Sequence, residues 1–152
     1  MKLATLLEQR GIHFERTIHP PTYTAQTLAA EEHESGYRVA KPVVVKGEGG
    51  FVMCVVPACA RVELEAVGRL LRDKTVRLAT ETEMAEMFPE CDLGAEPPVG
   101  ELFGLPTLMD DSLQDEDFLL LQAGTHTEAI KMRREDYQEI ARPRIDSIAS
   151  YE

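Results

Sequence analysis

Two valine-rich segments flank a short glycine-rich stretch in the first half of the sequence. The segments cover residues 39–46 and 51–56, and the stretch between them reads Gly47-Glu48-Gly49-Gly50. β-Branched side chains favour extended backbone, and glycines permit the positive φ angles that tight turns require. The pattern predicts a β-hairpin, so the chain must build a sheet in which these two strands are neighbours.

Short helices and further strands follow one another irregularly along the rest of the chain. Apolar spacing and helix-end signals predict helices over residues 2–10, 25–34, 62–71, 81–88 and 134–142. Further strands are predicted over residues 13–18, 76–79, 105–109, 118–122 and 127–132. Strict alternation of strand and helix is absent, which argues against a doubly wound parallel sheet. We expect a mixed or antiparallel sheet with short helices packed around it.

The segment 89–104 contains three prolines and three glycines and is predicted to be a long ordered loop. Long loops in compact domains are often functional. Within it, Gly94-Ala95-Glu96-Pro97-Pro98-Val99-Gly100 combines glycines, which allow close backbone approach to a ligand, with prolines, which stiffen the loop. Such a loop could aim N–H groups at an oxyanion. The alternative is a plain connection between two elements.

Length and cysteine content indicate one domain in a reducing compartment. A chain of 152 residues is the usual size of a single domain. The three cysteines have no close spacing and do not form a disulfide framework. The longest apolar run, residues 51–60, contains Pro57 and is too short to cross a membrane, and residues 1–10 lack the pattern of a signal peptide. We expect a cytoplasmic protein without a membrane partner.

The net charge of −11 is distributed unevenly. Residues 78–130 hold 13 of the 27 acidic residues and no Lys or Arg. The acidic excess argues against binding DNA or an anionic membrane over the whole surface. Two basic clusters outside that segment leave one face able to meet a polyanion, and solvated helix faces are the alternative. The clusters are Arg69, Arg72, Lys74 and Arg77, and Lys131, Arg133, Arg134, Arg142 and Arg144.

Several kinds of chemistry have no support in the sequence. There is no Walker loop, no GxGxxG and no nucleophile elbow, and neither the cysteines nor the four histidines have zinc-ligand spacing. Cys54 lies within an apolar strand, where a buried inert thiol is favoured over a nucleophile. The acidic residues at 110–117 do not have EF-hand spacing and are better explained as a polar turn. We expect neither a metal nor a cofactor.

Lys41 stands where the chain enters the apolar run Val43-Val44-Val45. A lysine there could direct its ammonium to a phosphate or hydroxyl at the end of the sheet, and an exposed surface lysine is the alternative.

Together these features, in this order, resemble the YbaK/EbsC family of aminoacyl-tRNA editing domains. That family includes free-standing ProX-type deacylases and the editing insertion of bacterial prolyl-tRNA synthetases. The resemblance covers about residues 19–140. It rests on Arg38-Val39-Ala40-Lys41, the hairpin ending in Phe51-Val52-Met53, Ala79-Thr80-Glu81, Gly94-x-x-x-Pro98-x-Gly100 and Leu108-Met109-Asp110-Asp111-Ser112-Leu113.

The resemblance implies an α+β fold around a curved, largely antiparallel sheet, with a pocket for the terminal adenosine and its esterified amino acid. It implies that residues 1–152 form one deacylase domain that hydrolyses the ester of a mischarged tRNA. Lys41 would be the catalytic lysine that engages the terminal nucleotide and positions the ester. The substrate-binding residues would be Gly94, Ala95, Pro98, Gly100, Asp110 and His126.

The absence of a Ser-His or Cys-His pair and of a metal signature argues against a covalent intermediate. Hydrolysis of an activated ester needs an oriented water and a stabilised oxyanion, and the ribose 2′-hydroxyl can transfer the proton. The leading hypothesis is a deacylase that acts in trans on the acceptor end of a mischarged tRNA with a small amino acid. A non-catalytic module that binds an aminoacyl-tRNA end or a partner synthetase is the alternative, and a hydrolase of another small ester is the third.

Two positions depart from the family pattern. Pro42 follows the lysine where a polar residue is common, and Val99 stands where an aromatic residue often lies. Both positions bear on the choice of amino acid, so alanyl, cysteinyl and seryl esters all stay open.

Overall fold

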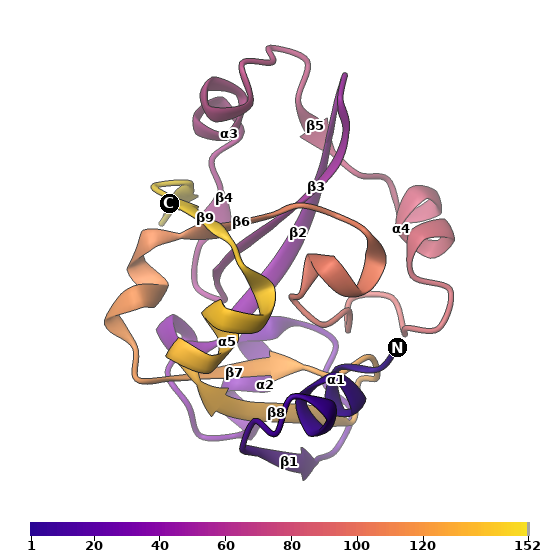
Figure 1. The fold of residues 1–152 in the computed structure, drawn as a ribbon, viewed down its shortest axis with the longest axis vertical. Helices are drawn as coiled ribbons and strands as arrows, with labels where there is room; N and C mark the ends of the chain where they lie inside the picture. Colours follow the sequence, from indigo (N-terminus) through magenta and orange to yellow (C-terminus); the bar gives the residue numbers. More distant parts are fainter. Residues whose placement is uncertain (152) are drawn as a thin grey trace.

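The computed structural model describes residues 1–151 and has an α+β architecture (Figure 1), which confirms the predicted fold class. The α-helices are α1 (Leu3–Gln9), α2 (Ala25–Glu31), α3 (Leu64–Leu71), α4 (Glu81–Met87) and α5 (Arg134–Ala141). The strands are β1 (Phe14–Ile18), β2 (Ala40–Gly47), β3 (Gly50–Pro57), β4 (Arg61–Val62), β5 (Arg77–Leu78), β6 (Thr107–Asp110), β7 (Phe118–Gln122), β8 (Glu128–Arg133), β9 (Arg144–Asp146) and β10 (Ala149–Ser150). Short 3-10 helices are η1 (Gly36–Arg38), η2 (Gly100–Phe103) and η3 (Asp111–Asp115).

The predicted hairpin is the spine of a five-stranded mixed sheet with the order β5-β2-β3-β6-β9. β2 and β3 pair antiparallel from Ala40↔Pro57 to Gly47↔Gly50, so the two-residue turn falls at Glu48-Gly49. β6 runs parallel to both β3 and β9. Figure 1 shows the hairpin rising to the upper end of the molecule, where α3 and β5 lie beside it.

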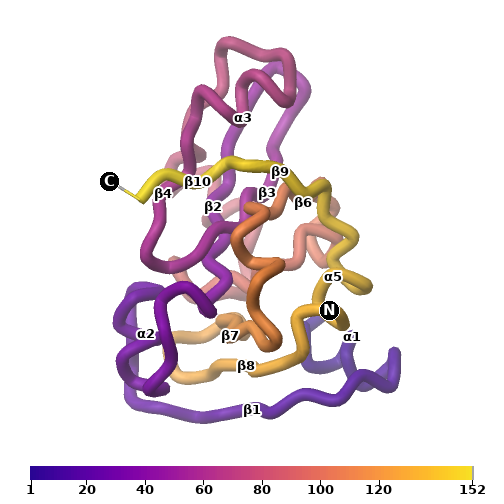
Figure 2. Tube along the Cα trace, turned by 90° about the vertical axis from the view of Figure 1, so that its left-hand side faces the viewer, coloured from indigo at the N-terminus to yellow at the C-terminus, as the bar shows by residue number. Residues whose placement is uncertain are grey.

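A second, antiparallel sheet of three strands, ordered β1-β8-β7, forms the lower part of the molecule (Figure 2). The two sheets meet where Val39, just before β2, forms a parallel bridge with Leu120 of β7. α2 packs over this junction, because Leu28 is buried in one apolar cluster with Val39, Leu120 and Ala129. A short third sheet pairs β4 with β10 near the C-terminal end of the chain.

Helix ends follow the signals in the sequence. Thr80 and Glu83 form the capping box predicted for α4, and Thr24 caps α2 through a reciprocal pair with Thr27. α2 ends at Glu31, earlier than the predicted residue 34, because the chain turns through a positive φ at His33. Within residues 1–151, no helix has the length and apolar character needed to span a bilayer.

The rest of the apolar interior lies on the two faces of the large sheet. The larger cluster joins the sheets and includes Met53, Met109, Leu121 and Tyr137. The smaller one packs α3 against the hairpin. Cys54 is buried in this smaller cluster, and burial raises the pKa of its thiol to about 12, as expected for an inert cysteine.

Candidate active site

Lys41 lines a pocket of about 440 Å³. Its ammonium donates a hydrogen bond to the carbonyl oxygen of Ala60 over 2.6 Å. Burial lowers the pKa of Lys41, the thiol of Cys59 opposes this shift, and the nearby cation of Arg61 adds to it. The pocket is lined by Thr24, Ala25, Gln26, Lys41, Ala58, Cys59, Ala60, Arg61 and Tyr151. Among residues 1–151, Lys41 has no carboxylate partner, so its charge is available to an anionic ligand.

A buried polar side chain, Gln122, lies near the junction of the two sheets. Lys41 and Gln122 each follow the Val39↔Leu120 bridge by two residues on their own strands. Because side chains alternate between the faces of a strand, both point to the side on which Val39 and Leu120 pack against α2. Gln122 is only 5% exposed, and its Oε1 has no hydrogen-bond partner among the described residues. A buried amide oxygen without a partner is rare in folded proteins.

His19 adds a second unpartnered atom at the same end of the lower sheet. It follows β1 and is 9% exposed, and its backbone N–H donates to the carbonyl of Thr127 over 2.8 Å. Its ring Nδ1 lies 2.7 Å from the carbonyl of Pro20, while Nε2 is buried and unpaired within the part of the chain that the structure describes.

Most of the Gly94–Gly100 loop is buried, and hydrogen bonds hold it to neighbouring parts of the fold. Residues 95–100 are all buried. The N–H of Ala95 donates to the carbonyl of Asp92, and the N–H of Gly100 donates to Thr107 Oγ1 over 3.1 Å. Tyr137, which is fully buried on α5, donates its hydroxyl to the carbonyl of Pro98 over 2.5 Å. The loop therefore has a single defined conformation that several parts of the fold support.

Gly94 differs from the rest of this loop because it is exposed and a carboxylate accepts its N–H. The Glu96 carboxylate accepts it over 2.9 Å, and Gly94 has a φ of 89°, a left-handed conformation that favours glycine. Burial raises the pKa of Glu96, while the hydrogen bond from Gly94 and the charge of His126 oppose the shift. A side-chain acceptor can be displaced without unfolding the loop, so this N–H is the main-chain donor best placed to serve a ligand.

His126 lies against Gly94 and Tyr23. A Cβ added at Gly94 would be 3.8 Å from His126 Cε1, and the ring centroids of Tyr23 and His126 are 4.8 Å apart. The backbone N–H of His126 donates to Asp92, and its Nδ1 is a further buried nitrogen without a partner among the described residues. Since Thr24 lines the Lys41 pocket, the segment Tyr23-Thr24 connects the His126 region to that pocket.

Asp110 anchors the backbone near the C-terminal end of the chain. It is buried, and Oδ1 accepts the backbone N–H groups of Ile148 and Ala149 over 2.9 and 3.0 Å. Its other oxygen accepts from Ser112, whose hydroxyl in turn accepts from Tyr151 over 3.0 Å. Asp110 thus reaches the Lys41 pocket only through Ser112 and Tyr151, and it anchors the segment that carries Tyr151.

The predicted site residues therefore do not form one cluster. Gly94 and His126 lie together beside Tyr23, and Lys41 lies in the neighbouring pocket. Gly100 is a close-packing position, since a Cβ there would overlap Thr107 Oγ1 and lie 2.5 Å from the Leu105 carbonyl. The residues that the sequence did not single out are His19, Cys59, Arg61, Gln122 and Tyr151.

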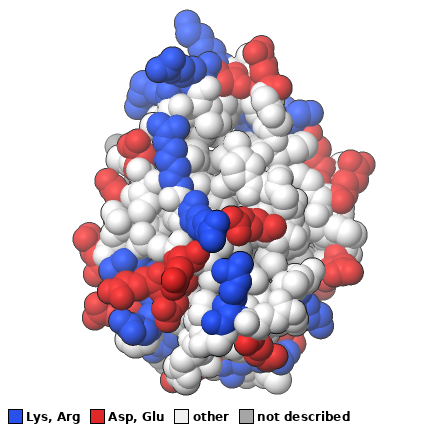
Figure 3. Space-filling view, in the orientation of Figure 1, with Lys and Arg blue, Asp and Glu red and all other residues white. Residues whose placement is uncertain are grey.

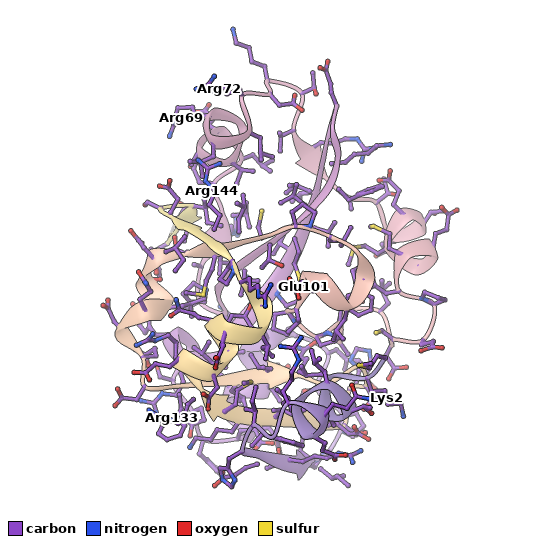
Figure 4. All side chains as sticks on the ribbon, in the orientation of Figure 1. Lys2, Arg69, Arg72, Glu101, Arg133 and Arg144 are labelled. Atoms are coloured by element: carbon purple, nitrogen blue, oxygen red, sulfur yellow. The ribbon has the colours of Figure 1, made fainter. Side chains whose placement is uncertain are left out.

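The basic residues gather at the upper end of the molecule. Figure 3 shows Lys and Arg side chains over α3 that continue down one face, and Figure 4 places Arg69, Arg72 and Arg144 on this side, with Arg133 far below. Arg69 and Arg72 line an open groove of about 610 Å³ with Lys74. Other members of the two basic clusters are paired, for example Arg77 with Glu83 at 2.8 Å.

Comparison with known proteins decides the family. The profile of the aminoacyl-tRNA editing domain matches residues 19–140, most of the chain. The chain belongs to this family. The match confirms the YbaK-type resemblance and the range over which the sequence suggested it. No curated protein matches the sequence.

Solved structures show how widely the fold of this editing domain occurs. A structure described as a candidate trans-editing enzyme for prolyl tRNA synthetase is 24% identical, with a TM-score of 0.86, over 97% of this chain and 94% of the other. The hypothetical protein APE2540 is 20% identical, with a TM-score of 0.88, over 97% and 99%. A candidate signal transduction protein from Marinobacter aquaeolei VT8 is 15% identical, with a TM-score of 0.73, over 96% of this chain but 30% of its own. At these identities the likeness concerns the fold alone.

Proposed function

We propose that this editing domain hydrolyses the ester of mischarged aminoacyl-tRNA and acts in trans as one domain spanning residues 1–152. The observation that carries the proposal is the Lys41 ammonium, which lines a pocket of about 440 Å³ without a carboxylate partner among residues 1–151. A cation in this position suits a phosphate or an ester oxygen of the terminal nucleotide. Its hydrogen bond to the carbonyl of Ala60 fixes the direction of the side chain.

In this proposal Lys41 positions the terminal adenosine, and the Gly94 N–H supports the ester carbonyl after the Glu96 carboxylate has moved aside. A water oxygen attacks the carbonyl carbon, and the bond from that carbon to the ribose oxygen then breaks. The water gives up one proton, which reaches the leaving ribose oxygen through the neighbouring 2′-hydroxyl. Placing the reactants together and stabilising the negative charge on the oxyanion are sufficient, because the ester is already activated.

A covalent intermediate is not part of the mechanism. Cys59 lines the pocket, but no histidine is among the lining residues to act as its base. The amino acid is expected to be small, because the Gly94–Gly100 wall is buried and bonded on several sides and leaves a larger side chain little room to displace it.

The body of the tRNA is expected to lie along the basic face near Arg69, Arg72 and Arg144 (Figures 3 and 4). The acidic total charge makes this contact weak and dependent on salt, since each phosphate contact releases counterions. Affinity for uncharged tRNA should fall as salt rises from low to moderate concentration. Affinity that is independent of salt would contradict this surface.

A panel of tRNAs mischarged with alanine, cysteine or serine, assayed for both ester hydrolysis and binding, tests the function. Turnover on at least one mischarged ester, with correctly charged tRNA spared, supports the deacylase. Binding without turnover on every ester would favour the non-catalytic module instead. Hydrolysis of small free esters in preference to aminoacyl-tRNA would favour a general esterase.

A further inference from the structure

Two exposed tyrosines stand together at the rim of the Lys41 pocket. Tyr37 is 55% exposed and Tyr151 is 49% exposed, and their ring centroids lie 5.9 Å apart with an angle of 32° between the planes. Tyr151 also lines the pocket directly. An exposed pair of aromatic rings beside a pocket offers a surface on which a planar group of a ligand can stack.

Hydrogen bonds hold the Tyr151 side chain and the backbone of Tyr37 in place. The hydroxyl of Tyr151 donates to Ser112 Oγ, and the strand that precedes Tyr151 pairs Ser150 with Arg61. Tyr37 lies in η1, whose first turn is capped by Ser35. The Tyr151 side chain and the backbone of Tyr37 are thus held by hydrogen bonds in the free protein.

Cationic groups lie on the same side of the pocket. Arg61 lines the pocket together with Lys41, and it is close enough to influence the pKa of that lysine. Proteins that bind single-stranded nucleic acid combine aromatic rings, on which bases stack, with cations that follow the phosphates.

We propose that Tyr37 and Tyr151 form a stacking platform for the unpaired bases that precede the terminal adenosine of tRNA, with Arg61 at the adjoining phosphate. The inference rests on the proposed function, because it assumes that the terminal adenosine enters the Lys41 pocket. A pocket of about 440 Å³ is filled by one nucleoside and its amino acid, so the preceding bases must leave across its rim. The aromatic pair lies on that rim.

Two substrates with the same ester separate the platform from the pocket. The first is a mischarged minihelix with an intact CCA end, and the second is aminoacyl-adenosine, which lacks both cytidines. Tyr37→Ala and Tyr151→Ala should each raise KM for the minihelix about tenfold more than KM for aminoacyl-adenosine, since one stacked base is lost. Tyr37→Phe and Tyr151→Phe keep the ring and should stay within about twofold of the unmodified protein on the minihelix.

Phe118→Ala is the matched control, because Phe118 is another exposed aromatic residue, 40% exposed, that lies beside Lys131 and outside the pocket. It should leave both substrates unaffected. Equal losses on the two substrates, or unchanged KM for the minihelix, would overturn the platform.

A binding measurement keeps the platform testable even if no ester is hydrolysed. The chain has no Trp and four Tyr, so tyrosine fluorescence reports on these rings during titration with the oligonucleotide ACCA. Quenching that Tyr37→Ala and Tyr151→Ala weaken supports the platform, and quenching that they leave unchanged refutes it. Hydrolysis by the unmodified protein is a separate result, and its absence would count against the proposed function alone.

Discussion

The Gly94–Gly100 loop and the Lys41 pocket lie near each other but are built in opposite ways. Residues 95–100 of the loop are buried, and the loop bonds to α5 and to the chain around Thr107. The pocket is open, and its lysine donates a hydrogen bond to a backbone carbonyl. The polar groups of the loop are hydrogen-bonded within the protein, whereas the Lys41 ammonium in the pocket can donate further hydrogen bonds to a ligand.

This difference assigns separate parts to the two regions in the proposed reaction. Residues 95–100 of the loop are buried and hydrogen-bonded to the rest of the fold, so they can hold a shape but, unlike the Gly94 N–H, contribute little to stabilising charge on a reacting ester. An ammonium held by one neutral acceptor can bind or stabilise an anion. We therefore expect changes in the loop to act on stability and positioning, and changes in the pocket to act on the rate and its pH dependence.

Gly100→Ala tests the wall where it is most tightly packed. A methyl group there would overlap Thr107 Oγ1 and lie 2.5 Å from the carbonyl of Leu105, so the chain must shift. We expect a loss of about 1–3 kcal/mol in the free energy of unfolding, measured by denaturant titration. Gly49→Ala is the control, because a Cβ at Gly49 meets nothing within 4 Å. Equal stability of the two variants would show that the loop is not tightly packed.

The pH profile tests the pocket. Burial lowers the pKa of Lys41 from its ordinary value of 10.5, so the ammonium is lost at a lower pH than in a free lysine. Above that pKa the enzyme-catalysed rate, corrected for spontaneous hydrolysis, should fall by about tenfold per pH unit. Lys41→Arg keeps its charge, so any remaining activity of that variant should lose this alkaline fall. A fall that persists in Lys41→Arg would assign the titration to another group.

The lowered pKa of Lys41 also predicts how the free energy of unfolding changes with pH. Between the lowered pKa of folded Lys41 and 10.5, the unfolded chain binds more protons than the folded one. The contribution of Lys41 to the free energy of unfolding therefore rises with pH across this interval, because the cost of burying the ammonium is relieved. Lys41→Ala should remove that rise, which urea titrations at a series of alkaline pH values would detect. An equal rise in the variant would contradict the assignment.

Tyr137→Phe tests how far the wall positions the substrate. It removes the hydrogen bond to the Pro98 carbonyl but keeps the buried ring. We expect a loss of about 1 kcal/mol in the free energy of unfolding and a fall of about fivefold in kcat/KM at a temperature well below unfolding. Reduced stability with unchanged kcat/KM would mean that the loop supports the fold without positioning the ester.

Cys59→Ala should have the smallest effect. Cys59 lines the pocket without a histidine among the other lining residues, so a covalent intermediate on its sulfur is not expected. The rate should stay within about twofold of the unmodified protein. A loss as large as that caused by Lys41→Ala, together with an acylated form seen by mass spectrometry, would replace the water mechanism with a covalent one.

The sequence predicts the regular elements well and the assembly of the site less well. The hairpin, the capping box at Thr80 and the helix over residues 134–142 follow from local signals and agree with the structure. β4, β9 and β10 were not predicted, because strands of two or three residues carry no measurable period. These short strands bring Tyr151 next to Arg61, which lies far from it in sequence.

The site residues show the same limit. Lys41 could be selected only together with the family motif, because a lysine at the start of an apolar strand is usually an exposed surface residue. Gln122 looks like an ordinary strand end, and only the Val39↔Leu120 bridge, which no local pattern encodes, relates its strand to the one that carries Lys41. Asp110 was predicted to bind substrate, and the structure shows it bonded to the backbone of Ile148 and Ala149, so its part in binding stays a prediction.

The most direct test of the account is the rate at which Lys41→Ala hydrolyses a mischarged minihelix, compared with Lys46→Ala. Lys46 lies on the same strand but pairs with Glu83 at 3.6 Å, away from the pocket. We predict that kcat/KM falls on the order of 100-fold or more for Lys41→Ala and is unchanged for Lys46→Ala, with both variants folded. Equal rates in the two variants would contradict the assignment of the chemistry to the Lys41 pocket.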